Sequence, residues 1–483
     1  MAAIVTSNFR VLNAENFKAD VGTDKVYVGI GKADVWSDST SDITDTTAPN
    51  PNDHLDDEGL ARANLLALKK VAASDISHVV TRYDWTSGRT YDAWDSADPD
   101  IFDKTFYIIT SEFKVYKCII SPGTASTIQP VQTLTAPTAE SDGYTWKYMY
   151  TISTADAEKF LTTSYMPVKT VDPRAGGQSS DYASDSTAED ALSEADFAQY
   201  LNQKASVQHA KAGGIERIVV TAAGVGYDSK PTVTISGDGT GADVQAAQIT
   251  MAGSGATQTV ASITLTDKGT DYRVANIAFS GGTPDTVAQA RAVLSPKQGH
   301  GTDPTRELGS FFIALNAKLD NSSGDDITTG NDFRQIILLK DPQVHNASAY
   351  AGAAATADVI KPMSGLKVAS VPSGALSNLQ VDEVIVGGSA NEPTAFVTEV
   401  DTTNSIIYYH QNEKTGFENF DNGETVTGQT SNQAAVLHAS AANVVHSGGG
   451  VDRRSGEMLF LENRAPISRT DTQIEDIKVI IEF

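Results

Sequence analysis

The sequence predicts a mainly β protein: a layered β-sandwich body with a few short helices in its loops, plus two inserted small all-β modules. Short apolar or alternating runs, separated by Gly, Pro, Asn and Asp, recur along most of the chain. Only 20% of the residues are charged, while Gly, Ser, Thr and Ala are abundant, as is typical of β-rich domains with many turns. At 483 residues the chain is too long for one ordinary core, so we expect two or three domains.

The N-terminal part of the chain is expected to supply two strands and a helix. Residues 3–9 and 25–30 predict the strands, which polar residues separate. The helix is expected over residues 56–73, where an apolar stripe recurs at helical spacing. Its acidic first turn, Asp56, Asp57 and Glu58, and two lysines near its end match the helix dipole.

The central part of the chain returns to strands. Three are expected, at residues 106–110, 113–120 and 144–152. Ser153 or Thr154 is expected to cap a short helix that ends near residue 161. A further helix is predicted over residues 186–203, because Ser186 and Glu189 have the spacing of a capping box.

An internal repeat begins after Gly213. The stretch IERIVVTAAGVGYDSKPTVTISG recurs about 45 residues later as VASITLTDKGTDYRVANIAFSGG, which aligns Gly224 with Gly269 and Tyr227 with Tyr272. Each copy predicts a strand, a glycine-containing turn and a second strand, with the glycine where positive φ is useful. Two such copies could form a compact all-β module.

The remaining chain also predicts strands. Residues 311–319 and 333–339 are expected strands of the body, and four short β runs occur within residues 366–443. Residues 457–462 and 474–483 predict a C-terminal β-hairpin, whose first strand is expected to stop at Asn463, Arg464 and Pro466.

We therefore expect one body and two insertions. Residues 1–206, 296–365 and 444–483 form the β-sandwich body, residues 207–295 form an inserted β repeat module, and residues 366–443 form an inserted β-hairpin module. Both insertions are expected at the surface, because a β core accepts added residues only at its loops.

Charge and cysteine content narrow the function classes. The net charge of −25, with no cluster of Lys or Arg, argues against nucleic acid or an anionic membrane as a partner. The one cysteine, Cys118, excludes an intramolecular disulfide framework and is expected to be a buried small hydrophobe. No signal peptide or membrane-spanning segment is expected, so the sequence predicts a soluble protein.

No catalytic, cofactor-binding or metal-binding residue is predicted. Phosphate-loop, zinc and nucleophile motifs are absent from the sequence. His300, between two glycines, is interpreted as a turn residue rather than a metal ligand. Asp238 and Asp243 resemble half of a calcium loop that lacks its remaining carboxylates. The acids at 56–58 are explained by a helix N-terminus. We therefore predict no enzyme and no cofactor.

An aromatic and acidic loop spans residues 83–100. Trp85, Tyr91 and Trp94 could form a platform for a sugar, but aromatic residues also anchor protein interfaces and cores. Interface or core is the favoured interpretation.

Five segments in the same order resemble one family. They are AIVTSNFR from Ala3, VYVGIGKADVWSD from Val26, TRYDWTSGRTYD from Thr81 with DGYTWKYMYTI from Asp142, FRQIILLKDP from Phe333, and SGEMLFLENRAPI with DTQIEDIKVIIEF at the C-terminal end. Together they resemble the baseplate wedge subunit family, gene product eight, of T-even-type contractile-tailed bacteriophages. Residues 207–295 and 366–443 have no counterpart in that resemblance.

The resemblance implies a virion structural protein of the tail baseplate, assembled in the host cytoplasm. It implies a homodimer that bridges other baseplate wedge proteins and moves with the baseplate on tail contraction. An alternative from another class is a carbohydrate-binding or hydrolytic tail protein that contacts the host surface. That alternative predicts paired carboxylates in a groove or an exposed aromatic platform.

Overall fold

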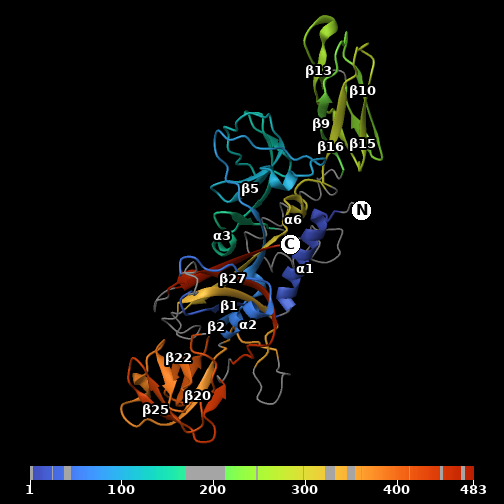
Figure 1. Ribbon diagram of the computed structural model, residues 1–483. Helices are drawn as coiled ribbons and strands as arrows, with labels where there is room; N and C mark the ends of the chain where they lie inside the picture. Colours follow the sequence, from blue (N-terminus) through green and yellow to red (C-terminus); the bar gives the residue numbers. More distant parts are fainter. Residues whose placement is uncertain are drawn as a thin grey trace, which may run out of the picture. The chain divides into compact units, whose positions relative to one another are not determined.

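The computed structural model describes residues 4–23, 25–36, 45–169, 213–245, 248–296, 299–320, 332–344, 354–360, 362–412, 414–445, 450–468 and 474–483. These residues are mostly strands in antiparallel sheets, so the mainly β prediction is confirmed (Figure 1). The chain divides into two compact units. Unit 1 comprises Met1–Glu15, Ser77–Ala314 and Ile481–Phe483, and unit 2 comprises Asn16–Ile76 and Leu315–Ile480.

Unit 1 contains a four-stranded sheet in the order β4-β5-β7-β6. Its strands are β4 (Tyr107–Ile109), β5 (Lys114–Ile120), β6 (Thr138–Ala139) and β7 (Thr145–Thr151). Further elements are β3 (Ile76–Thr81), α3 (Thr154–Phe160), β8 (Tyr165–Pro167) and α6 (Pro304–Glu307). The three central strand predictions and the Ser153-capped helix are confirmed, since Ser153 accepts the N–H of Asp156.

Unit 1 also holds the first module, residues 213–296. Its strands are β9 (Ile215–Ala222), β10 (Thr232–Gly237), β11 (Thr240–Asp243), β12 (Ile249–Ala252), β13 (Thr259–Ile263), β14 (Asp267–Thr270), β15 (Ala275–Ser280) and β16 (Gln289–Leu294). Four of them form a sheet in the order β10-β15-β16-β9, and the others pair as β11-β14 and β12-β13.

The predicted repeat in this module is confirmed by reciprocal contacts. The Tyr227 N–H donates to the Gln258 carbonyl at 3.1 Å, and its repeat mate Tyr272 donates to Gly213 at 3.0 Å. Gly224 and Gly269 have φ of +66° and +62°, and a Cβ on either would lie 2.8 Å from the tyrosine ring three residues later. The conserved spacing of glycine and tyrosine within the chain therefore encodes a turn that only glycine fits.

Unit 2 contains a five-stranded sheet in the order β19-β2-β1-β18-β27. Its strands are β1 (Val26–Gly31), β2 (Leu65–Lys70), β18 (Phe333–Lys340), β19 (Val359–Ile360) and β27 (Glu457–Ile467). The helix α2 (Leu55–Ala63) precedes β2, and β17 (Phe312–Asp320) and β28 (Ile474–Glu482) are neighbours in another sheet. Tyr27, Leu65, Leu68, Ile337 and Leu339 lie in its core, each with no exposed surface.

Unit 2 also holds the second module, residues 362–445. Its strands are β20 (Ser364–Ser370), β21 (Val384–Gly387), β22 (Thr394–Asp401), β23 (Ile406–His410), β24 (Thr425–Gly428), β25 (Ala434–Leu437) and β26 (Asn443–Val445). The order is β23-β22-β21-β24-β25-β20-β26, and β20 also pairs with β23, so six strands close into a barrel. Figure 1 shows this module in orange.

The second module is also duplicated. Glu383 accepts the N–H groups of Gln380 and Ser431, and Glu424, at the equivalent place, accepts those of Asp421 and Ser389. Each glutamate thus binds its own loop and the turn of the other half. Short 3₁₀ helices complete the described elements: η1 (Ala73–Asp75), η2 (Ile101–Asp103), η5 (Gly255–Thr257) and η6 (Leu376–Asn378).

Four predictions about local structure are wrong. Residues 3–9 were expected as a strand, but the helix α1 (Ser7–Thr23) begins there and buries Val11, Ala14 and Val21. The expected helix over 56–73 ends at Ala63, because the apolar residues that follow pair as β2 with β1 and β19.

The C-terminal hairpin is the third error. The strands β27 and β28 belong to different sheets, where they pair with β18 and lie beside β17 respectively. β27 also continues through Asn463 and Pro466, because it is an edge strand and a register shift opposite Phe333–Gln335 accommodates the proline. The helix predicted over residues 186–203 lies outside the described residues.

Candidate functional site

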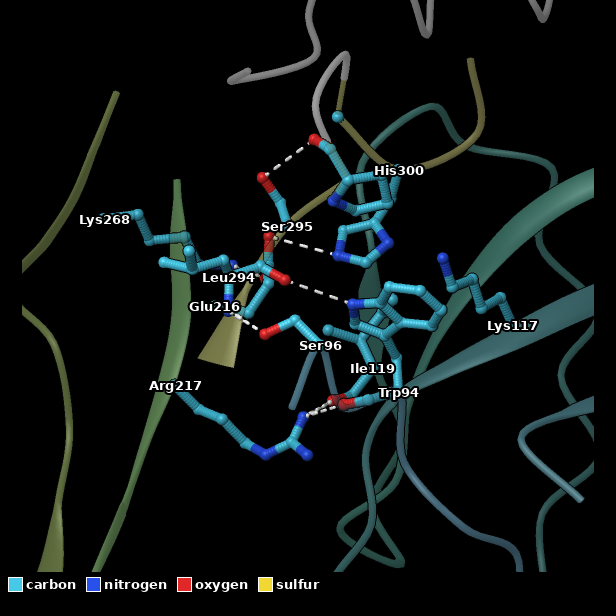
Figure 2. Close-up of polar contacts among 12 residues, drawn as sticks. Trp94, Ser96, Lys117, Ile119, Glu216, Arg217, Lys268, Leu294, Ser295 and His300 are labelled. Carbon is cyan, nitrogen blue, oxygen red and sulfur yellow. Dashed lines mark hydrogen bonds and ion pairs between the residues drawn. The ribbon is translucent and has the colours of Figure 1, made fainter. Parts of the chain in front are cut away.

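A buried polar cluster lies where the first module meets the rest of unit 1 (Figure 2). We call Trp94, Lys117, Glu216, His300 and Glu307 the junction cluster. Lys117 is on β5, Glu216 is on β9, Glu307 ends α6, and Trp94 and His300 come from loops. The strand that opens the first module therefore contributes directly to this cluster.

An ion pair between Lys117 and Glu307 forms the centre of the cluster. The Lys117 Nζ atom lies 2.9 Å from Glu307 Oε2, and the two side chains are 0% and 3% exposed. The Glu307 carboxylate also accepts the N–H groups of Gly301 at 2.8 Å and Asp303 at 3.1 Å. These donors satisfy the carboxylate, as a buried charge requires.

A second buried lysine lies directly across the sheet from the first. Lys147 on β7 is opposite Lys117 on β5, and it is 1% exposed. Burial lowers the pKa of Lys147 to about 8, an effect that the Glu307 charge opposes. Like charges opposite each other destabilise a sheet, and the negative charge of Glu307 reduces this repulsion.

The Trp94 side chain connects the cluster to the first module. Lys117 Nζ lies 3.9 Å from the centroid of the Trp94 ring, and the Trp94 indole N–H donates to the Leu294 carbonyl at 3.1 Å. The His300 ring meets the same indole edge-to-face, with centroids 6.1 Å apart. One aromatic side chain thus binds the lysine of β5 and the last strand of the module.

His300 and Glu216 complete the cluster on the side of the module. His300 Nε2 lies 3.4 Å from Glu216 Oε1, and Glu216 Oε2 accepts a hydrogen bond from Lys268 at 2.6 Å. Burial raises the pKa of Glu216, but His300 and Lys268 outweigh burial and lower it to about 2. Burial, followed by the Lys117 charge, lowers the pKa of His300, so the imidazole is neutral at neutral pH.

Beside the cluster, a row of polar contacts continues the attachment. Arg217 donates to the carbonyls of Trp94 at 2.5 Å and Ile119 at 2.9 Å. Asp95 accepts from Arg291 of β16 at 2.7 Å, and Ser96 accepts the Leu294 N–H at 2.9 Å. The first and last strands of the module are therefore both bound to the same loop.

The chemistry of this arrangement is that of an attachment. Burial raises the pKa of Glu307, but the Lys117 charge, together with the Gly301 N–H group, outweighs burial and lowers the pKa. The carboxylate is thus ionised and satisfied, while the imidazole is neutral and enclosed. Among the described residues no group of three or more His, Cys, Asp or Glu side chains could hold a metal ion. The cluster joins two parts of unit 1.

The structure assigns different roles to the residues singled out in the sequence. His300 lies in a turn, as predicted, but its side chain is buried in the junction cluster. Asp238 uses its carboxylate to accept the N–H groups of Arg273 and Val274. The acids at 56–58 lie in the first turn of α2, as predicted, and Cys118 is fully buried.

The aromatic loop contributes to the interior. Tyr91 is 1% exposed, and the Trp94 ring is covered by Lys117. The half-buried Trp85 donates its indole N–H to Ser126 at 3.2 Å. These three rings therefore form core and junction contacts.

Sequence reasoning missed Lys117, Lys147, Glu216 and Glu307. A signal was present for the first two, because each lysine interrupts an otherwise apolar strand, in VYKCII and TWKYMY. A lysine in a strand buried on both faces requires a partner, but the partner's position, 190 residues away for Lys117, follows only from the fold.

Comparison with protein-family models gives a match. A family model described as Phage-Gp8, bacteriophage T4 Gp8, matches residues 3–134. The resemblance stated from the sequence is therefore confirmed over those residues. No curated protein matches the chain. No helix of the described residues is long and apolar enough to cross a membrane.

Proposed function

Because residues 3–134 match the Phage-Gp8 family, whose members are structural baseplate wedge proteins, we propose that this chain is a structural component of a phage tail baseplate wedge. The match is the observation that carries the proposal. It covers Trp85, Tyr91 and Cys118, which lie in one core of unit 1, and Trp94 and Lys117 of the junction cluster.

The proposal also covers the oligomeric state, the partners, the location and the domain organisation of the chain. The chain acts by protein–protein assembly, as a homodimer that bridges other wedge subunits and moves with the baseplate when the tail contracts. It has no catalytic role, and it is assembled in the host cytoplasm before it becomes part of the virion. Residues 207–295 and 366–443 are insertions in a body formed by 1–206, 296–365 and 444–483.

The contacts of the junction cluster support a firm attachment of the first module to the rest of unit 1. Its contacts are buried, charged and aromatic, and they bind both ends of the module to one loop. In an assembly protein, such a joint makes the module follow the body instead of swinging on a linker.

The experiment is assembly with purified wedge proteins. The native mass of the chain is measured by light scattering, and the chain is then mixed with the other wedge subunits of its phage. A mass near twice 51.1 kDa and a stable complex are expected. A chain that binds none of the wedge subunits would contradict the structural role, whereas a monomer that still joins the complex would contradict only the dimer.

The carbohydrate alternative receives less support. One of its two expected features is an exposed aromatic platform, whereas Tyr91 of the aromatic loop is buried and the Trp94 ring is covered by Lys117. Binding of the chain to host surface polysaccharide, unchanged by mixing with wedge proteins, would favour it over assembly.

A further inference from the structure

A group of exposed apolar side chains lies in the N-terminal segment of unit 1. We call Ile4, Val5, Phe9 and Leu12 the N-terminal patch; their exposed fractions are 86%, 65%, 53% and 45%. No other nine consecutive residues of the described chain expose as many large apolar side chains. Such a concentration of exposed apolar surface on a folded domain marks a binding surface.

The N-terminal patch follows the outer face of α1. Phe9 and Leu12 are three positions apart in the helix, so their side chains lie on one face. Val11 and Ala14 lie on the opposite face and are 1% and 0% exposed. The helix is therefore apolar on two sides, and the described chain buries one of them.

Side-chain contacts fix the helix in this orientation. The Arg10 guanidinium lies 3.6 Å from the centroid of the Phe311 ring and forms an ion pair with Glu482. Further along the helix, Glu15 forms an ion pair with Arg306 of α6 at 2.7 Å. A rotation of α1 that buried the N-terminal patch would break these contacts, so the patch is held outward by the fold.

The exposed surface around the patch is uncharged. The exposed residues between positions 4 and 15 are Ile4, Val5, Thr6, Asn8, Phe9 and Leu12. The whole chain has a net charge of −25, so two copies that approach through charged surfaces repel each other. A two-fold contact brings each patch against the same patch, where any charge would face its own copy. An uncharged apolar face avoids that repulsion, as the centre of an interface requires.

We propose that the N-terminal patch binds the same patch of a second copy of this chain about a two-fold axis. The inference rests on the homodimer of the proposed function, and it adds the surface that forms the dimer. Phe9 and Leu12 form the centre of the contact, where apolar anchors exclude water. The Asn8 amide beside them both donates and accepts, so it can pair with its own copy. Arg10 and Glu15 are already paired within the chain and need no new partner.

The first test is the mass of the full chain at increasing concentration, measured by sedimentation equilibrium. The unchanged chain is expected to approach twice 51.1 kDa. The double variant Phe9→Glu, Leu12→Glu places four carboxylates in the contact, and its dimer should be weaker by about 30-fold or more. An unchanged dimer affinity in this variant would overturn the proposal.

A matched control comes from the same unit. Val131 and Leu134 are 58% and 59% exposed, are also three positions apart, and lie outside the N-terminal patch. The double variant Val131→Glu, Leu134→Glu adds the same charge and is expected to dimerise as the unchanged chain does. A loss of affinity as large as that of the patch variant would show that added charge alone separates the copies, and the proposal would fail.

Chemical cross-linking locates the contact without weakening it. Asn8→Cys places an exposed thiol beside Phe9, and the native Cys118 is fully buried. A short bis-maleimide reagent is expected to join two copies of this variant, but not two copies of Ser111→Cys, which exposes a thiol in the turn before β5. Equal cross-linking of the two variants would overturn the proposal.

Other occupants of the patch give different results. If another part of the same chain covers the patch, the unchanged chain is a monomer, and Phe9→Glu, Leu12→Glu lowers its thermal midpoint. If another wedge subunit binds there, the unchanged chain is a monomer, and the variant loses its complex with that subunit. Either result would overturn the contact between copies and leave the baseplate role intact, since only failure to bind every wedge subunit contradicts that role.

Discussion

Glu307→Gln is the most informative change in the junction cluster. It removes the charge that faces Lys117 at 2.9 Å while it keeps the size of the side chain. Glutamine can still accept from Gly301 or Asp303, but Lys117 then lies in a buried site without the charge of its ion-pair partner. Breaking a buried ion pair from one side costs about 3–5 kcal/mol, and we expect a loss of that order.

An ion pair between the turn before β5 and the first residue of that strand provides the control. Glu112 and Lys114 lie 2.7 Å apart, closer than the buried pair, but the Glu112 side chain is 59% exposed. Such surface pairs contribute less than about 1 kcal/mol. Glu112→Gln therefore tests whether burial, and not distance, sets the cost.

The assay must report locally, because a chain of several units does not unfold in one step. Hydrogen exchange of peptides that cover residues 114–120 and 299–309 gives the opening free energy of the cluster. The double variant Lys117→Met, Glu307→Leu is expected to recover part of the loss, since apolar residues replace buried ion pairs at little cost. A Glu307→Gln loss no larger than that of Glu112→Gln would refute the reasoning.

Three further predictions follow from the same structure. The pKa of Glu216 is lowered from 4.5 to about 2, so its stabilising contribution of up to about 3 kcal/mol is complete above pH 4.5 and is lost as the pH falls towards 2. The Glu216→Gln variant should not lose this stability in acid. The same pH dependence of stability in the variant and the unchanged chain would contradict this. Gly224→Ala should destabilise the first module more than Gly255→Ala, because both glycines have positive φ but only Gly224 has neighbours within 2.8 Å of an added Cβ; equal losses in thermal midpoint would show that φ alone matters. Cys118 is fully buried, and burial raises the pKa of its thiol. A thiol reagent should therefore modify no cysteine in the folded chain and one per chain in denaturant. Rapid modification of the folded chain would contradict the burial of Cys118 on β5.

The mainly β class and many strands could be predicted because their signals are local. An alternating or apolar run, such as residues 144–152, forms a strand whichever strand pairs with it. The Ser153 cap depends only on residues within one helical turn. The repeat of Gly224 and Gly269 was also visible, because one backbone geometry recurs at a fixed spacing.

The errors at residues 65–70 and in the C-terminal hairpin have one cause, which is pairing between distant segments. Residues 65–70 carry helix-forming residues, but β1 and β19 lie on either side of them and convert them to a strand. The strands β27 and β28 are close in sequence and each suits a hairpin, but β18 and β17 take them into different sheets. The intrinsic secondary-structure preference of a short segment contributes less than backbone hydrogen bonds to neighbouring strands together with burial of one face.

The sequence alone determined the fold class, the repeat, the buried Cys118 and the resemblance to one family, because these depend on composition and on short patterns. Only the tertiary structure decided that Lys117 forms an ion pair with Glu307 and that Trp94 donates to the last strand of the first module. Each of these contacts joins residues tens to hundreds of positions apart. The partner of a buried charge depends on which segments lie next to each other in the fold, and a short sequence pattern does not contain that information.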